Sequence, residues 1–404
     1  MRILFLEPFY GGWHKDFADG LREHSRHDIA LATLPARFWK WRMRGAALHF
    51  VRSLSSSVTS PSDARGHHPN LDLILATDLM SIADLRALWP GRVPPIVLYM
   101  HESQLSYPVP EGGRMDLHFG FTDITSALAA DAVLFNSVFH RDQFFTELPR
   151  FLGRLPEFRP LWVHDEIRRK SLVLYPGCRI PAVGRLPADR RSRDGLSADA
   201  SGRRGDDRPP RIIWNHRWEF DKQPEVFFRV LRALKHRGIR FEVAIMGENF
   251  QAKPKCFISA AEDLADEIVR FGYVENRDEY LAELGTGDVV VSTAVQENFG
   301  ISVIEAMRYG CIPVLPNRLS YPELIPTALH AEVLYDSESA LEARLELLCT
   351  PGVSAVEHAG LRRRVQEVAA RHAWASRIEE YDELFDRIAE DSAAIAEDAE
   401  RRDG

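Results

Sequence analysis

Two cationic side chains, Arg217 and Lys222, lie five residues apart, after the apolar run 211–214 and before the amphipathic segment 225–237. An arginine fork and a lysine point charge suit a diphosphate leaving group, whose negative charge must be neutralised as its bond breaks. The alternative is a pair of solvated cations that pair with Glu219 and Asp221. Ligands of open parallel sheets bind beyond the carboxyl ends of the strands, so the position of the two cations favours the diphosphate site, and both are expected to be catalytic.

Two glutamates, Glu297 and Glu305, lie eight residues apart after the apolar run 288–292. A helical pattern from about Ile301 to Tyr309 places Glu297 before the helix and Glu305 just over one turn inside it. The first backbone N–H groups of a helix have no partner within it and attract anions. This arrangement suits a sugar diphosphate, with phosphate on the amides and hydroxyls on the carboxylates. The donor is expected to contact Gly247, Asn298, Phe299, Gly300, Ile301 and Glu305, and Glu297 is expected to be catalytic.

Polar residues also follow two apolar runs in the first half of the chain. After run 2–7 come Gly11 and Gly12, which permit close backbone approach at the start of a helix that favours an anion. An ordinary strand-to-helix turn explains these glycines equally well. After run 95–100 comes His101, which could donate to a substrate oxygen, or could be a structural residue that ties down a loop. The prediction is a donor contact for Gly11 and Gly12, a catalytic role for His101, and acceptor contacts for Tyr10, Trp13, His14, Glu102 and Gln104.

The stretch 37–44 alternates four cations with three aromatic residues. This composition grips phosphates while stacking exposed nucleobases. Both a helical and an extended reading leave cations and an aromatic ring on one face. The alternative is that the tryptophans pack into the core and the cations form a solvated rim. The acceptor-binding residues predicted from this stretch are Arg37, Trp39, Lys40, Trp41, Arg42 and Arg44.

Short apolar runs, each followed by a turn and an amphipathic segment, predict two α/β units with parallel sheets. The runs are 2–7, 71–77, 95–100, 132–135 and 171–175 in the first unit and 211–214, 241–246, 288–292 and 311–315 in the second. The predicted domains are 1–181 and 211–372, joined by a polar, flexible linker at 182–210. A helix within 373–404 is expected to pack back on the first domain and to end in a charged tail from 390. Residues 53–70 are expected to form a loop.

Composition limits the class of protein. The chain has 404 residues and a formal net charge of −8, which argues against a basic footprint over the whole surface. The four cysteines, Cys178, Cys256, Cys311 and Cys349, match neither a metal clip nor a compact disulfide framework. No apolar run reaches the length of a membrane helix, and run 2–7 reads as a strand and not as a leader. A cytoplasmic protein without a membrane span is expected. No Asp-x-Asp pair is placed to hold a divalent ion against phosphate, so metal-free chemistry is the simpler expectation.

In combination these motifs resemble the retaining glycosyltransferases of the GT-B fold that carry an E-x7-E motif, here Glu297 to Glu305, with Arg217 and Lys222 at the positions of the donor-phosphate cations. A closer similarity is carried by FLEPFYGGWHKDFADGL, LPARFWKWRMRGAALHF, YMHESQLSYPV, WNHRWEFDKQPEVFFRVL and VSTAVQENFGISVIEAMRYGCIPVLPNRLSYPELIP. These segments resemble the tRNA-queuosine α-mannosyltransferase group.

The resemblance implies two Rossmann-like domains that face each other across a cleft. It implies GDP-mannose as donor, the cyclopentenediol of queuosine in tRNA as acceptor, retention of configuration, and no cofactor beyond the nucleotide sugar. Two alternatives stay open at this point. One is a GT-B transferase with a lipid, polysaccharide or small-molecule acceptor, and the other is a non-catalytic module that binds tRNA or a nucleotide sugar.

Overall fold

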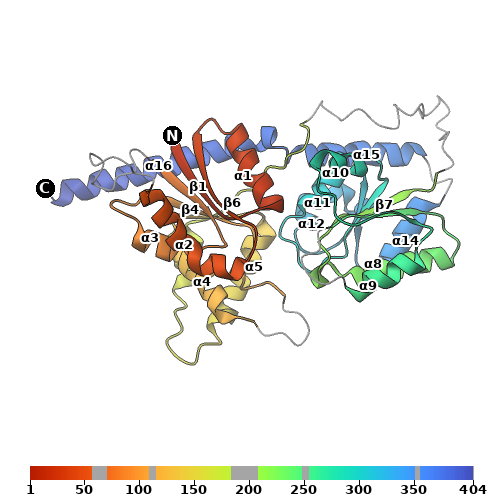
Figure 1. Cartoon of the computed structure of the whole chain (residues 1–404), viewed down its shortest axis with the longest axis horizontal. Coiled ribbons are helices and arrows are strands. Elements are labelled where there is room, and N and C mark those ends of the chain that lie inside the picture. The colour runs from red at the N-terminus through yellow and green to blue at the C-terminus, as the bar shows by residue number, and fades with distance from the viewer. Residues whose placement is uncertain (57–70, 109–114, 183–207, 248–253, 351–354, 404) are drawn as a thin grey trace. The chain divides into compact units, whose positions relative to one another are not determined.

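A computed structural model describes residues 1–56, 71–108, 115–182, 208–247, 254–350 and 355–403 (Figure 1). The chain divides into two compact units. The N-terminal unit comprises Met1–Arg179 and Trp374–Gly404, and the C-terminal unit comprises Ile180–Ala373. Most of the predicted 182–210 linker and most of the predicted 53–70 loop lie outside the described residues.

The N-terminal unit is built on a six-stranded parallel sheet with the order β2-β1-β3-β4-β5-β6. Strands β3 and β4 are buried at every position, because helices cover both faces of such a sheet and leave no solvated side. The strands are β1 (Arg2–Tyr10), β2 (Asp28–Pro35), β3 (Leu73–Thr77), β4 (Ile96–Met100), β5 (Ala132–Phe135) and β6 (Ser171–Val173). The helices are α1 (Gly12–His24), α2 (Trp39–Ser56), α3 (Ile82–Leu88), α4 (Leu117–Ala129), α5 (Val138–Leu152), α6 (Val163–Arg169) and α16 (Trp374–Asp403).

The C-terminal unit has a second six-stranded parallel sheet, with the order β12-β11-β10-β7-β8-β9. Its strands are β7 (Arg211–Trp214), β8 (Glu242–Ile245), β9 (Ile268–Phe271), β10 (Val289–Val291), β11 (Ile312–Pro316) and β12 (Leu334–Tyr335). Its helices are α8 (Pro224–His236), α9 (Lys255–Asp263), α10 (Arg277–Leu284), α11 (Ile301–Arg308), α12 (Tyr321–Leu324), α13 (Thr327–Val333), α14 (Glu338–Cys349) and α15 (Ala355–Ala370), with the 3-10 turn η2 (Phe220–Lys222).

Three strands, β2, β9 and β12, were not among the predicted runs, and each lies at or next to a sheet edge. β2 and β9 are only partly buried and lack the continuous apolar run of a central strand, whereas β12 is buried but only two residues long, too short to form such a run. One further expectation is corrected, because residues 53–56 belong to α2. The charged tail expected from residue 390 continues α16 as a helix to Asp403.

The last helix, α16, belongs to the N-terminal unit although it follows the whole C-terminal unit in sequence. Trp374 at its start is buried against Phe17 of α1, with ring centroids 5.5 Å apart. A Cβ at Gly20 or Gly177 would lie 1.9 or 2.2 Å from the Trp374 ring, so glycine is needed at both positions. The tryptophan therefore anchors α16 on the first sheet. None of the helices in the described part of the chain is long and apolar enough to cross a membrane.

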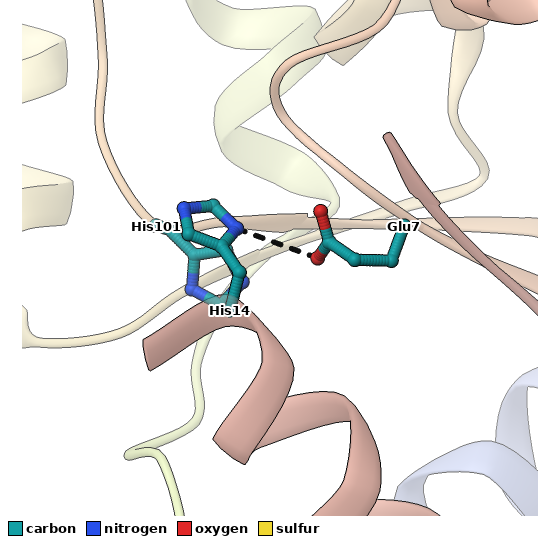
Figure 2. Close-up of side chains that lie close together, drawn as sticks. All are labelled: Glu7, His14 and His101. Carbon is teal, nitrogen blue, oxygen red and sulfur yellow. Dashed lines mark hydrogen bonds and ion pairs between the residues drawn. The ribbon is translucent and has the colours of Figure 1, made fainter. Parts of the chain in front are cut away.

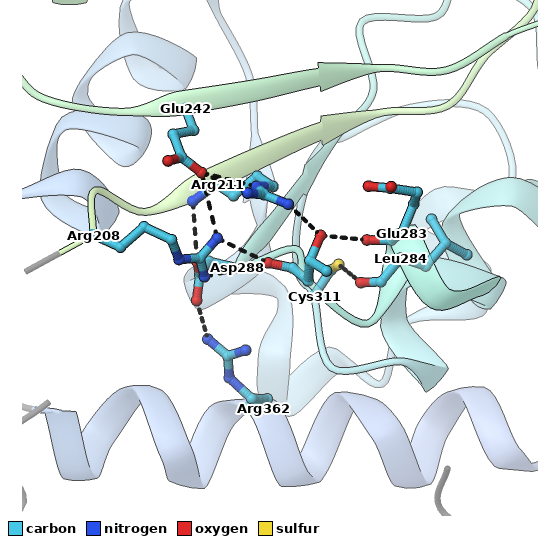
Figure 3. A network of polar contacts seen from close by, with 9 residues as sticks. Arg208, Arg211, Glu242, Glu283, Leu284, Asp288, Cys311 and Arg362 are labelled. Atoms are coloured by element: carbon cyan, nitrogen blue, oxygen red, sulfur yellow. Dashed lines mark hydrogen bonds and ion pairs between the residues drawn. The ribbon is translucent and has the colours of Figure 1, made fainter. Parts of the chain in front are cut away.

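The amino-terminal edge of the second sheet is held by a network of ion pairs and hydrogen bonds (Figure 3). Asp288, just before β10, accepts from the Arg211 backbone at 3.0 Å and from Arg362 at 3.1 Å. Arg211 also donates to Glu242 at 2.9 Å and to Thr286 at 2.7 Å. Parallel sheets bind ligands at the carboxyl ends of their strands, whereas this network lies at the amino ends. We therefore assign it a structural role.

Candidate active site

Lys222 is a buried cation at the carboxyl edge of the second sheet, in the turn η2 that follows β7. Its Nζ donates to the Gln296 carbonyl at 2.6 Å and lies 3.4 Å from Glu297 and 3.1 Å from Asp221. Burial alone would lower the pKa of this amine, but the two carboxylates outweigh burial, so the pKa is raised. The ammonium therefore keeps its charge at neutral pH, in a place where water screens it little.

Glu297 is the partner that links Lys222 to the loop before α11. Burial raises the pKa of this carboxyl group, but Lys222, His216 and Arg217 together lower it below its usual range. The structure thus brings together two of the predicted catalytic residues, Lys222 and Glu297. Lys222 and Gln296, whose carbonyl accepts from the lysine, are 74 residues apart in sequence. The third, Arg217, affects the same carboxylate and pairs with Glu219 at 3.2 Å, with 44% of its side chain exposed.

The N-terminus of α11 follows the predicted strand-to-helix turn. Gly300 precedes the helix with φ 97°, a backbone conformation that favours glycine, and a Cβ there would make a tight contact of 3.0 Å with the Tyr321 ring. Asn298, Phe299 and Gly300 are buried beside it, and the Asn298 amide oxygen accepts from Gln296 at 3.1 Å. The backbone amides at the start of this helix can bind a phosphate.

Glu305 lies inside α11 and is buried. One of its oxygens accepts from Arg277 and the other from the Tyr280 hydroxyl at 3.0 Å. Asn215, at the end of β7, donates to the same hydroxyl at 2.9 Å and to the Ser302 carbonyl at 2.8 Å. The carboxylate is therefore held in place by α10 and could accept ligand hydroxyls only by sharing or exchanging these donors.

The loop after β8 contacts the same edge of the sheet. A Cβ at Gly247 would lie 1.8 Å from the His216 carbonyl, so the predicted donor residue Gly247 is required for backbone packing. Burial, with Lys222 nearby, lowers the pKa of His216 to about 4, so its imidazole is neutral. A hollow of about 240 Å³ lies beside this site, lined in part by Thr293, Val295 and Arg318, and it contains none of the predicted donor residues.

In the N-terminal unit the carboxyl edge carries histidines and carboxylates (Figure 2). His14, in the first turn of α1, lies 3.4 Å from the Glu7 carboxylate of β1, and its ring centroid is 4.4 Å from that of His101 after β4. Burial lowers the pKa of His14, but Glu7 and the neighbouring carboxylates outweigh it and raise the pKa above its ordinary value. Burial, with His14, lowers the pKa of His101 well below the usual value, so His101 is neutral.

Acidic side chains hold the loop that begins with His101. Asp78, just after β3, accepts from the backbone amides of His101 at 3.0 Å and Glu102 at 3.3 Å. Burial, then the charge of Glu102, raises the pKa of Asp78 to about 7. Asp123 accepts from the Gln104 amide at 2.6 Å, and burial raises its pKa well above the usual range. Asp78 and Asp123 therefore hold the loop 101–104 between β3 and α4, and within the loop the Gln104 side chain donates to Glu102 at 3.0 Å.

Glu7, His14 and His101 are the group in the described residues that could hold a metal ion. One ligand atom from each lies within 4.8 Å of the others. Glu7 also accepts from the Phe9 amide at 2.8 Å and from Thr77 at 3.1 Å. The same three side chains could also hydrogen-bond the hydroxyls of a ligand.

The predicted residues where β1 ends and α1 begins have different surroundings. The Tyr10 hydroxyl donates to the buried Asp19 of α1 at 2.6 Å, so it belongs to a partly buried network on that helix. Gly11 lies against Ala36, since a Cβ there would be 2.4 Å from the alanine Cβ, and Gly12 has φ 50°. Trp13 joins the histidine group, with its ring centroid 4.9 Å from that of His101.

The stretch 37–44 is helical from Trp39 onward, which matches the helical and not the extended reading of the sequence. Trp39 packs against the small cluster of Met43, Leu79 and Phe119, whereas Trp41 is 76% exposed. The cations are also divided. Lys40 and Arg44 lie over the Phe119 ring at 6.0 and 5.6 Å, and Arg42 donates to the Pro35 carbonyl at 3.2 Å.

Sequence reasoning missed several residues of these sites. Glu7 was counted as part of a strand, and Asp78, Asp123, Arg277 and Tyr280 were given no role. An acid directly after an apolar run, as Asp78 is after β3, was the available signal. Asp123, Arg277 and Tyr280 reach the sites from the helices α4 and α10, which no local pattern reveals.

Comparison with known proteins identifies the family. The family profile described as "tRNA-queuosine alpha-mannosyltransferase N-terminal" matches residues 2–178, and the profile "Glycosyl transferases group 1" matches residues 201–351. The tRNA-queuosine alpha-mannosyltransferase of Drosophila melanogaster is 38% identical over 349 residues, which cover 86% of each chain. The chain belongs to the tRNA-queuosine α-mannosyltransferase family. The resemblance found in the sequence is therefore confirmed.

Solved structures with the same fold have lower sequence identity. Sucrose-phosphate synthase from Thermosynechococcus elongatus has a TM-score of 0.67 at 14% identity, covering 96% of this chain and 99% of its own. The HepE protein of Anabaena, in complex with UDP and glucose, has a TM-score of 0.63 at 15% identity, covering 96% and 100%. These similarities, with the two parallel six-stranded sheets, confirm the predicted GT-B fold class of two Rossmann-like units.

Proposed function

We propose that this chain is a retaining glycosyltransferase that moves mannose from GDP-mannose to the cyclopentenediol of queuosine in tRNA. The observation that carries the proposal is the 38% identity, over 86% of both chains, to a tRNA-queuosine alpha-mannosyltransferase. The charged residues at the carboxyl edges of the two sheets supply matching chemistry. Cations in the C-terminal unit suit a nucleotide diphosphate, and imidazoles and carboxylates in the N-terminal unit suit the hydroxyls of sugar and acceptor.

Catalysis would come from the diphosphate end of the donor. Charge grows on the departing phosphate oxygens in the transition state, so preorganised donors there lower the barrier without tightening substrate binding equally. Lys222 is fixed by Gln296 and Glu297 before any ligand binds, and the first amides of α11 have a fixed direction. Arg217, which is partly exposed, would join them as a fork on the phosphate.

The two glutamates of the E-x7-E motif would divide the hydroxyl contacts. Glu305 would accept from the ribose hydroxyls, taking the place of the Arg277 or Tyr280 hydrogen bonds. Glu297 would hold hydroxyls of the transferred sugar. Its lowered pKa keeps it ionised at neutral pH, so that it is an acceptor only.

In the N-terminal unit His101 would orient the sugar or the attacking hydroxyl. Its pKa is low enough that the ring is neutral and can donate through one nitrogen while accepting through the other. Glu102 and His14 border the same position. Reaction on the same face as the leaving group needs no protein nucleophile, so none is assigned.

The test is mass spectrometry of tRNA nucleosides after incubation with the protein and each of GDP-mannose, GDP-glucose and UDP-glucose. We expect a hexose on queuosine with GDP-mannose and no addition to tRNA from cells that lack queuosine. Transfer to a lipid or sugar acceptor with no change in queuosine would contradict the proposal. The four cysteines are free, which is compatible with the reducing cytoplasm as the place of action.

A further inference from the structure

Two exposed phenylalanines of the N-terminal unit have left-handed backbone. Phe38 has φ 57° and is 68% exposed, and Phe158 has φ 49° and is 89% exposed. A left-handed conformation costs roughly 1–2 kcal/mol for a residue with a Cβ. An exposed ring contributes little hydrophobic stabilisation to offset that cost. Neither backbone preference nor core packing therefore accounts for a phenylalanine at these two positions.

Both residues lie in segments that alternate cations with apolar side chains. Phe38 directly precedes α2 in the stretch 37–44, and Phe158 lies in the connection between α5 and α6. This connection also exposes Arg154, Arg159 and Trp162, the last with an exposed fraction of 63%. In the second segment the cations and aromatic residues are more widely spaced than in 37–44, so they form no local pattern.

Residues at the start of α4 contact both segments. On one side Phe119 contacts Trp39, with ring centroids 5.1 Å apart. On the other side Phe121 contacts Phe151 at 5.2 Å, and Arg154 donates to the Met115 sulfur at 3.0 Å. Residues 37–44 and 150–162 therefore border the same helix end, and we refer to them together as the docking surface.

The charge of the docking surface is opposite to that of the whole chain. Four cationic residues between 37 and 44 and three between 150 and 162 make seven, against the single acid Glu157, in a chain whose formal net charge is −8. The core of a protein–protein interface is poor in charge, whereas surfaces for single-stranded nucleic acid combine cations with exposed aromatic rings. The composition therefore favours an RNA partner over a second copy of this chain.

We propose that the docking surface binds the acceptor RNA next to the modified nucleotide, with Phe38 and Phe158 stacking on unpaired bases and the adjacent arginines holding phosphates. This inference rests on the proposed function, because it takes tRNA as the acceptor. It goes beyond the reaction by assigning the RNA contact to two residues with no role in transfer. Stacking of a base on an aromatic ring explains why the rings are presented to solvent at the expense of backbone strain.

The test replaces each phenylalanine by glycine, which tolerates a positive φ. A structural residue loses stability when it is removed, but here the melting temperature of Phe38→Gly and Phe158→Gly should stay equal or rise. The dissociation constant for queuosine-containing tRNA, measured by fluorescence anisotropy, should rise about 5- to 150-fold for each variant, the range of a lost base stack. Leu319→Gly relieves the same kind of strain, at φ 63° in the other unit, and should leave tRNA affinity unchanged.

A second measurement separates stacking from charge. Arg154→Ala with Arg159→Ala should weaken binding and reduce the salt dependence of the binding constant by about 0.7 per lost phosphate contact, whereas the glycine variants should keep the salt dependence. Unchanged tRNA affinity in both glycine variants, or a lost affinity that follows a lower melting temperature, would overturn the inference. A glycine variant whose oligomeric state changes while its RNA affinity does not would also overturn the inference. Absence of hexose transfer by the wild-type protein would instead contradict the proposed function.

Discussion

The carboxyl edges of the two sheets have the same backbone architecture and opposite chemistry. In the C-terminal unit the edge places the Lys222 ammonium between Gln296 and two carboxylates, next to the start of a helix. In the N-terminal unit the corresponding edge gathers Glu7, Asp78 and the two histidines, with aromatic rings packed around them. Six parallel strands alone do not determine which ligand an edge binds. The side chains that follow the strands do.

The difference suggests how the two halves of a transfer reaction are divided. A diphosphate needs fixed positive charge, because its own charge grows during the reaction. Hydroxyl groups need acceptors and neutral imidazoles, which hold a nucleophile without a permanent opposing charge. Variants of the C-terminal edge should therefore impair both sugar transfer and slow donor hydrolysis, whereas variants that affect acceptor binding should impair transfer and spare hydrolysis.

The largest effect is expected for Lys222→Ala. Removing the ammonium leaves Glu297 and Asp221 buried without it, so the free energy of unfolding should fall by about 3–5 kcal/mol and the rates of transfer and hydrolysis by about 10²–10³-fold. Chemical denaturation and turnover assays measure the two effects. Lys235→Ala removes an exposed lysine that pairs with Glu267 in the same unit and should change neither by much. Rates close to wild type would remove Lys222 from the chemistry.

Arg217→Ala should have a similar effect on rate and little effect on stability. The side chain is partly exposed and pairs with Glu219, so its loss leaves no buried charge without a partner. We expect turnover to fall by about 10²–10³-fold, the range for a lost charge-stabilising donor, with an unchanged melting temperature. Arg229→Ala, which breaks a comparable exposed pair with Glu338, is the control. An equal decrease in both variants would show a nonspecific effect.

The tryptophans of the stretch 37–44 should behave differently from each other. Trp41→Ala removes an exposed ring, so the KM for tRNA should rise by the equivalent of about 1–3 kcal/mol while donor hydrolysis and stability are kept. Trp39→Ala removes a ring packed on Phe119, so stability should fall by about 1–3 kcal/mol, less than for a fully buried tryptophan. If the two variants give the same pattern of KM and melting temperature, the assignment of Trp41 to tRNA binding and of Trp39 to packing is wrong.

The smallest effect is a pH dependence from Asp78. Its pKa is raised to about 7 by burial and by Glu102, so the folded state holds a proton that the unfolded state has already released. Its contribution to stability is full below pH 4 and is lost as the pH rises toward 7, by at most about 1.4 kcal/mol per pH unit. Between pH 6 and 7 the stability of the wild type should therefore fall more steeply than that of Asp78→Asn. Parallel curves from denaturant titrations would contradict the shift.

The central strands and the motif residues were accessible from the sequence because their signals are local. A parallel strand covered on both faces must be apolar at successive positions, as β3 and β4 are, and a strand-to-helix turn such as 297–301 shows its glycine. The edge strands β2, β9 and β12 lacked that signal. Asp123, Arg277 and Tyr280 lacked any, because they reach their sites from helices that the chain forms elsewhere.

Residue types and their order are enough to predict two α/β units, the residues that follow their strands, and the positive charge of Arg217 and Lys222. Three features depend on the folded chain: Lys222 is buried against Glu297, Asp78 and Glu7 flank the histidines, and Trp39 is packed while Trp41 is exposed. Residue type sets what a group can do, but burial and neighbouring charges set its protonation and accessibility, and both depend on contacts between segments far apart in the chain.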